Sequence, residues 1–270
     1  MTGSVFFETL RRNWRQIIYW GIGLALYALY PFVLLPDSTD GLEGMVELME
    51  MFDSNMLAAV GLADVSAMAT PVGIVGYTIN FVLLVTAVFA VIAGLNVTSA
   101  EEDAGIMDVL LSWPIPRWRL VIEKALAYGV MMIGIAIFMG LGMLIGKQIA
   151  PIEVEVTNGL LLSAALSVVP PTLVIMAVTI VVSTVVRRRA MAAAVSGVFV
   201  VASFMLDAVA NVAGTGFAES VSRFSIFSYY DGFEALASGV DVPVAAMLIS
   251  LLAVMVAAST VFFHRRDIAV

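Results

Sequence analysis

The sequence contains no cysteine and a single histidine, His264. A chain without cysteine cannot form a disulfide, a thiolate metal site or a cysteine nucleophile. One histidine also excludes a metal site built from several histidines and argues against a Ser-His-Asp triad. We therefore expect no catalytic residue, no metal site and no cofactor bound by this chain itself.

Charged residues are scarce as well. They make up 13% of the 270 residues, whereas 61% are hydrophobic. A soluble domain has about 25% charged and about 45–50% apolar residues. The composition therefore predicts an integral membrane protein, and we expect it in the cell membrane as a multi-pass protein in contact with lipid, with no nucleic-acid partner.

Six segments are long and apolar enough to cross a bilayer, which takes about 20 residues of α-helix. They cover roughly residues 16–35, 72–97, 125–146, 159–186, 190–213 and 243–263. These spans predict an all-α fold with a single permease domain over residues 1–270. An even number of spans places both termini on one side of the membrane.

Basic residues indicate which side that is. With this arrangement, Lys147 and Arg223 are the two of the 13 Lys and Arg residues that fall on the side away from the termini. Lys and Arg accumulate in cytoplasmic loops. We therefore expect both termini in the cytoplasm, and segments 36–71 and 214–242 outside.

Three segments between or before the spans show patterns of their own. Residues 1–15 carry Phe6, Phe7, Leu10 and Trp14 at helical spacing, which predicts an amphipathic helix in the inner membrane interface. Segment 36–71 has apolar residues at helical spacing, which predicts a helix across the outer surface. Segment 214–242 is aromatic, which favours anchoring rings in the headgroup layer over a substrate-stacking site.

Two features inside the spans have open interpretations. Gly142 and Gly146 form a G-x-x-x-G pattern, which allows close helix approach either in a dimer or within one chain. Asn80 and Asp207 are possible pathway-lining residues, because polar groups inside a membrane often mark transport routes. The alternatives are an interhelical hydrogen bond for Asn80 and solvation at the membrane edge for Asp207.

The stretch "EEDAGIMDVLLSWPIPRWRLVIEK", residues 101–124, lies between the second and third spans. Acids at its start suit the N-terminal end of a helix, and apolar residues through Trp113 give that helix a broad apolar surface. Pro114 and Pro116 end the helix, since proline lacks the amide donor. We expect a short amphipathic helix at 101–113, shaped to fit the groove of a partner protein.

This stretch resembles the signature of ABC-2-type transporter permeases. The residues that match position by position are Glu101, Glu102, Gly105, Asp108, Leu110, Leu111, Pro114, Arg117 and Lys124. Ile106, Pro116 and Glu123 depart from the pattern, at positions where Thr, Ser and Gly are usual.

The resemblance implies a half-transporter whose residues 101–113 form a coupling helix on a separate ATP-binding subunit. That subunit would bind ATP and Mg²⁺, and a second copy of this chain or a paralogue would complete the pathway of an exporter. An ion-coupled secondary transporter or a channel-like protein is the alternative. It would need polar groups or broken helices near the membrane midplane, and here Asp207 and the Pro170-Pro171 pair are the features that could supply them.

Overall fold

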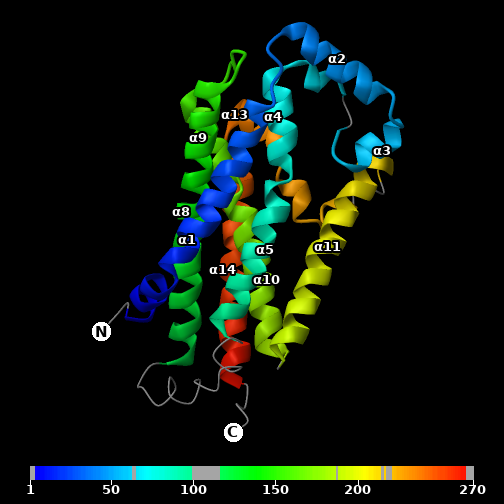
Figure 1. The fold of residues 1–270 in the computed structure, drawn as a ribbon. Coiled ribbons are helices and arrows are strands. Elements are labelled where there is room, and N and C mark those ends of the chain that lie inside the picture. Colours follow the sequence, from blue (N-terminus) through cyan, green and yellow to red (C-terminus); the bar gives the residue numbers. More distant parts are fainter. Residues whose placement is uncertain are drawn as a thin grey trace.

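A computed structural model describes residues 4–62, 65–98, 116–186, 188–213, 216 and 221–265. The elements formed by these residues are all helices, with no β-strand among them. The longer helices pack side by side, and both ends of the chain lie at the same end of the bundle (Figure 1). We call this the terminal end, and the end that carries segment 36–71 the distal end.

Among the described residues, six helical stretches are long and apolar enough to cross a membrane, which agrees with the predicted number of spans. Four of them are single helices and two are pairs of shorter helices. In chain order they are α1 (Ser4–Val33), α4 (Pro71–Asn80) with α5 (Val82–Val97), α8 (Arg117–Ile149), α9 (Asn158–Ser167) with α10 (Val169–Val185), α11 (Arg189–Ala213) and α14 (Val242–Arg265).

The helix that contains the first predicted span begins well before residue 16. Residues 4–33 form one α-helix, so the amphipathic N-terminal stretch continues directly into the span. We had expected a separate helix over 1–15, with the span starting near residue 16. The periodicity changes at that point, but no proline or glycine pair interrupts the backbone there. The location of this stretch in a membrane interface stays a prediction.

Helix α8 packs along α1, and this is the most extensive helix pair in the described structure. The G-x-x-x-G residues of α8 face α1. A methyl group on Gly142 would lie 2.2 Å from the Ala25 carbonyl oxygen, and one on Gly146 would lie 2.6 Å from the Phe32 ring. The glycine pair is therefore used for packing within one chain, which decides between the two interpretations left open above.

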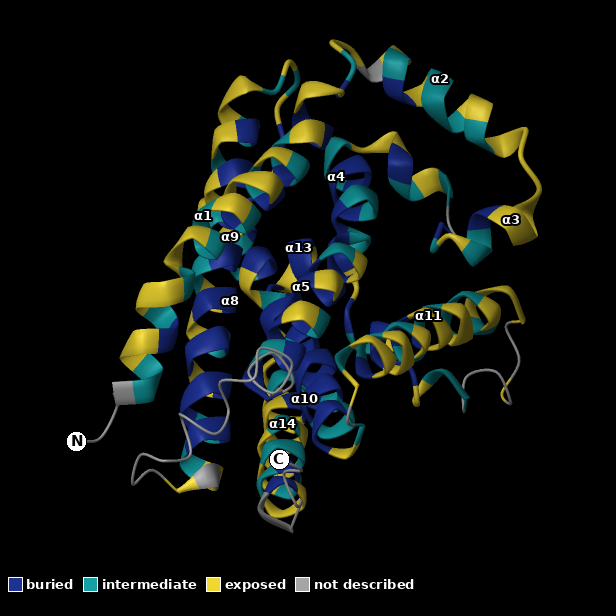
Figure 2. Cartoon of the chain, turned by 60° about the horizontal axis from the view of Figure 1, so that its bottom comes forward, coloured by how far each residue is buried: buried dark blue, intermediate teal, exposed yellow. Residues whose placement is uncertain are grey.

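Helices α5, α8 and α10 carry much of the buried core, whereas α11 and α14 expose most of their surface (Figure 2). Two hydroxyl pairs join α5 to α10. Thr86 and Thr172 are 2.8 Å apart, and Thr98 and Ser183 are 2.7 Å apart. Buried hydroxyls paired across helices satisfy groups that would otherwise be costly in an apolar interior.

The distal segments are short helices with side-chain caps. They are α2 (Thr39–Glu50), α3 (Ser54–Ala59) and the 3₁₀ turn η1 (Val65–Ala69). Ser38 caps α2 by accepting from the Gly41 amide, and α2 lies across the distal end of the bundle (Figure 1). Leu42, a residue of α2, is buried. The predicted helix in segment 36–71 is thus present.

The aromatic segment before the last span folds differently from our expectation. It contains the 3₁₀ turn η2 (Phe227–Tyr229) and α13 (Gly232–Ser238), and α13 packs against α4 and α9. Phe227 and Tyr230 are buried in the protein core, although Phe224 is exposed. The interpretation as a set of headgroup anchors is therefore wrong for Phe227 and Tyr230, because the loop turns inward and the rings fill space between helices.

Candidate functional site at the terminal end

The predicted coupling residues belong to the connection between α5 and α8. Residues 99–115 lie outside the described residues, so Glu101, Glu102, Gly105, Asp108, Leu110, Leu111 and Pro114 cannot be placed. Arg117 is the first residue of α8. What the structure describes is how the two helices that carry this connection are held at the terminal end.

The C-terminal end of α5 is held by side chains from two other helices, α8 and α11. The Lys124 ammonium of α8 donates to the Asn96 and Val97 carbonyl oxygens, at 3.5 and 3.3 Å. The Arg189 guanidinium of α11 donates to the Asn96 side-chain oxygen at 3.1 Å. The last carbonyls of a helix have no intrahelical donors, and a cation there also matches the negative end of the helix dipole.

Glu123, which precedes Lys124 on α8, binds the N-terminal end of α1, whereas Lys124 binds the C-terminal end of α5. Its Oε2 accepts from the backbone amides of Val5 and Phe6, both at 3.1 Å. Its Oε1 accepts from the Arg119 Nε one turn earlier on α8. The first amides of a helix lack intrahelical acceptors, and a carboxylate is stabilised at that positive end.

We call this arrangement the terminal node: Glu123 and Lys124 on α8, the first turn of α1, and Asn96 to Thr98 at the end of α5. It is a mechanical site rather than a chemical one, since its two charged side chains, Glu123 and Lys124, are engaged with helix ends and an ion pair. A connection that leaves α5 and enters α8 starts and ends at this node.

A second polar node lies where the second span breaks, between α4 and α5. A break leaves carbonyl oxygens of the preceding turn without their usual amide partners. The Tyr27 hydroxyl donates to the Thr78 oxygen at 2.7 Å, and the Tyr230 hydroxyl donates to the Ile79 oxygen at 3.1 Å. Burial raises the pKa of Tyr230, so its hydroxyl stays protonated and keeps donating.

Asn80, one of the two possible pathway-lining residues, belongs to this second node. Its side-chain oxygen accepts from the Gly232 amide at 3.0 Å, which ties α13 to the end of α4. Asp207, the other residue, is half-buried on α11, and Asn211 one turn later donates to it at 3.5 Å. The structure does not bring Asn80 and Asp207 together by any described contact, and their pathway role stays a prediction.

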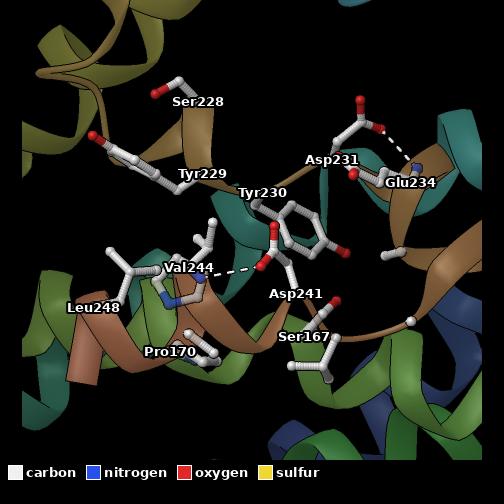
Figure 3. Close-up of a pocket in the computed structure, with 15 residues that line it drawn as sticks. Ser167, Pro170, Ser228, Tyr229, Tyr230, Asp231, Glu234, Asp241, Val244 and Leu248 are labelled. Carbon is white, nitrogen blue, oxygen red and sulfur yellow. Dashed lines mark hydrogen bonds between the residues drawn. The ribbon is translucent and has the colours of Figure 1, made fainter.

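A cavity of about 120 Å³ lies between α10, the segment before α13, and α14 (Figure 3). Pro170 and Leu248 line it with Tyr229. Its two aspartates already cap helices: Asp231 accepts from the amides at the start of α13, and Asp241 accepts from the Val244 amide of α14. Because both carboxylates already accept hydrogen bonds from backbone amides, we regard the cavity as part of the packing between helices.

Residues 9–268 match the family described as "ABC-2 family transporter protein". The chain belongs to the ABC-2 transporter family. The match covers nearly all of the sequence, including the second node and all of the terminal node except the first turn of α1. No curated protein matches this sequence.

In this ABC-2 transporter protein, the coupling role of residues 101–113 stays a prediction, and the sequence did not indicate several partners in the terminal node. Glu123 had been noted as a departure from the family pattern, and Lys124 as one of its matching residues. Neither the α1 amides nor Asn96 had been connected with them. The position of Glu123 and Lys124 could have indicated that they have partners, because two adjacent opposite charges at the start of an apolar span need them.

Proposed function

We propose that this chain is the membrane-spanning permease subunit of an ATP-driven ABC exporter. The observation that carries the proposal is the ABC-2 family match over residues 9–268, together with six helices able to cross a membrane. The permease forms the translocation pathway as a dimer, with a second copy or a paralogue. Separate subunits bind ATP and Mg²⁺ and hydrolyse the ATP.

The proposed coupling element is the segment 101–113, at the terminal end, which we place in the cytoplasm. The positive-inside distribution of Lys and Arg supports this orientation. The terminal node supports the coupling role, because the helices on either side of the connection are held there by hydrogen bonds. Closure of the ATPase subunits pushes on the segment, and the push reaches α5 and α8 through that node.

An ion-coupled secondary transporter is the second candidate. Spans two and four are each divided into two helices, and divided helices bind ions in such transporters through unwound backbone carbonyls. At the α4–α5 break, however, the hydroxyls of Tyr27 and Tyr230 donate hydrogen bonds to the carbonyl oxygens that an ion would have to coordinate. These hydrogen bonds favour a packed hinge over an ion site and support the exporter.

The test begins with affinity purification of the full-length chain in mild detergent, with identification of what comes with it. We expect a stoichiometric ATP-binding subunit. The variant Leu110→Glu/Leu111→Glu should then lose this subunit, or lose the effect of the permease on its ATP hydrolysis, because two charges remove the apolar surface that fits the groove.

A matched control is Leu48→Glu/Met51→Glu, which places the same charges on exposed side chains at the distal end. This control should keep the ATP-binding subunit. The coupling assignment is wrong if the Leu110/Leu111 variant assembles and hydrolyses ATP like the unmodified chain. Purification as a stable dimer without any ATPase, with flux driven by an ion gradient, would favour the secondary transporter.

A further inference from the structure

The terminal node contains a contact that the coupling motif does not require. Glu123 reaches the first turn of α1, 118 and 117 residues away in the chain, and accepts from two successive backbone amides. Its side chain is only 12% exposed. Hydrogen bonds to an ionised, sheltered carboxylate are about twice as strong as neutral ones.

The adjacent residue makes the complementary contact with a different helix. Lys124 donates to the last carbonyls of α5, whereas Glu123 accepts from the first amides of α1. Successive residues on an α-helix point about 100° apart, so the pair reaches two neighbours on different sides of α8. Each charge has the sign that its helix end stabilises.

Helix α1 is fixed to α8 a second time, toward the distal end. There the Ala25 backbone lies against Gly142, and the Phe32 ring lies against Gly146. These glycines lie about 28 to 35 Å along α8 from Glu123, at about 1.5 Å per residue. Two attachments so far apart on one long helix resist both sliding and rotation of α1 against α8.

We propose that Glu123 is a positioning residue that joins α1 to α8, so that the two helices move as one body when the 99–115 connection is displaced. The inference that the movement is driven by an ATPase rests on the proposed function. The joining of α1 to α8 does not rest on it. When α8 moves, Glu123 makes α1 move with it, and Lys124 makes α5 move with it.

The first test measures the contact itself in the full-length chain. Because the chain has no cysteine, Phe7→Cys and Trp118→Cys can carry two nitroxide labels without background. Both side chains are exposed, at 67% and 51%, on α1 and at the start of α8. Pulsed electron resonance then gives the distribution of distances between the two helices near the node.

We expect one narrow distribution in the labelled chain that retains Glu123. Glu123→Ala should raise the population with an undocked α1 turn about tenfold or more, since a charged acceptor is lost from two amides. Glu123→Gln should restore the narrow distribution in large part, because its carboxamide oxygen still accepts. Glu8→Ala is the control: it removes an exposed pair with Arg11 on α1 that does not involve α8.

The second test asks whether the contact transmits movement. The complex with its ATP-binding subunit is labelled at the same two positions and compared with and without trapped nucleotide. The distance should stay constant between these states in the chain with Glu123 and should change in Glu123→Ala. The variant should also lose the permease-dependent change in ATP hydrolysis while keeping the ATPase bound, whereas a merely structural residue would alter thermal stability alone.

Unchanged distances in Glu123→Ala would overturn the joining of α1 to α8. Altered distances with normal permease-dependent hydrolysis would overturn its role in transmission. Failure of the proposed function gives a different result: no ATPase is recovered even with the unmodified chain, while the first measurement still decides the contact between the helices.

Discussion

At the scale of single residues, this protein uses polar side chains mainly to complete backbone hydrogen bonding. Glu123 accepts from amides at the start of α1, and Lys124 donates to carbonyl oxygens at the end of α5. Tyr230 donates to a carbonyl oxygen at the break after α4. In an apolar environment an unsatisfied backbone group costs several kcal/mol. Polar residues at helix ends and breaks therefore have a structural explanation, which must be considered before a substrate contact is assigned to them.

The Tyr230 hydroxyl gives a prediction at this scale. Tyr230→Phe removes the donor to the buried Ile79 oxygen but keeps the ring in place. Leaving a buried acceptor without its partner costs about 1–3 kcal/mol. We expect a lower free energy of unfolding of this size, measured by thermal or denaturant unfolding of the purified chain in detergent.

Tyr229→Phe is the control for this change. Its hydroxyl also donates to a backbone oxygen, that of Arg223, but at an exposed position where water can replace it. This variant should lose less stability than Tyr230→Phe. Equal losses in the two variants would contradict the role assigned to the Tyr230 hydrogen bond.

At the scale of helices, α1 and α8 form the most closely packed pair because glycine allows their backbones to approach. Gly142 lies directly against the Ala25 backbone of α1. Close backbone approach at small residues is a main source of helix association in membranes, where the hydrophobic effect does not drive helices together. Gly142 is therefore a position at which the approach of α1 to α8 is sensitive to an added methyl group.

Gly142→Ala tests this dependence. The added methyl group would meet the Ala25 carbonyl oxygen at 2.2 Å, so α1 has to shift. Overpacking of this kind costs about 1–3 kcal/mol. We expect a loss of thermal stability and a changed distance between labels on α1 and α8.

Gly129→Ala on the same helix is the matched control. The nearest atom to its added methyl group is a Leu173 side-chain carbon at 3.9 Å, an ordinary contact. Alanine is also a better helix former than glycine by about 1 kcal/mol. The packing argument fails if Gly129→Ala destabilises the protein as much as Gly142→Ala does.

At the scale of the whole molecule, the two ends of the bundle differ in character. The terminal end carries both chain ends and the node of helix termini, whereas the distal end carries α2 and its neighbouring short helices (Figure 1). The helices α11 and α14 expose apolar surface along much of their length (Figure 2). We expect lipid to cover much of this surface, and the proposed dimer would use part of it.

The orientation of the bundle can be tested directly, again because the chain has no cysteine. Leu48→Cys on α2 should react with a membrane-impermeant maleimide in intact cells. Trp118→Cys should react only after the membrane is disrupted. Both side chains are exposed in the structure, so a difference in labelling reports the side of the membrane rather than burial.

The unmodified chain provides the background for this labelling. Positive charges favour the cytoplasmic side during insertion, which is the reason for expecting the terminal end inside. Labelling of Trp118→Cys in intact cells, with protection of Leu48→Cys, would invert the orientation. It would also remove the segment 101–113 from reach of a cytoplasmic ATPase.

Sequence alone determined the membrane character, the six spans and the family. These properties depend on local composition and length, since a bilayer sets the number of apolar residues per helix whatever the helix packs against. The break at the Pro170-Pro171 pair was also predictable, because proline restricts its own backbone and that of the preceding residue. The structure divides the fourth span at Val168, two residues earlier.

Only the tertiary structure decided the partners. The sequence could not show that Glu123 meets the start of α1, that Gly142 faces the same chain, or that Phe227 and Tyr230 turn inward. Each of these depends on which surfaces meet between helices that are separate in the sequence, and in a uniformly apolar sequence many pairings bury similar surfaces. Local periodicity specifies a helix and its faces, but packing and hydrogen-bond satisfaction select the neighbour that each face receives.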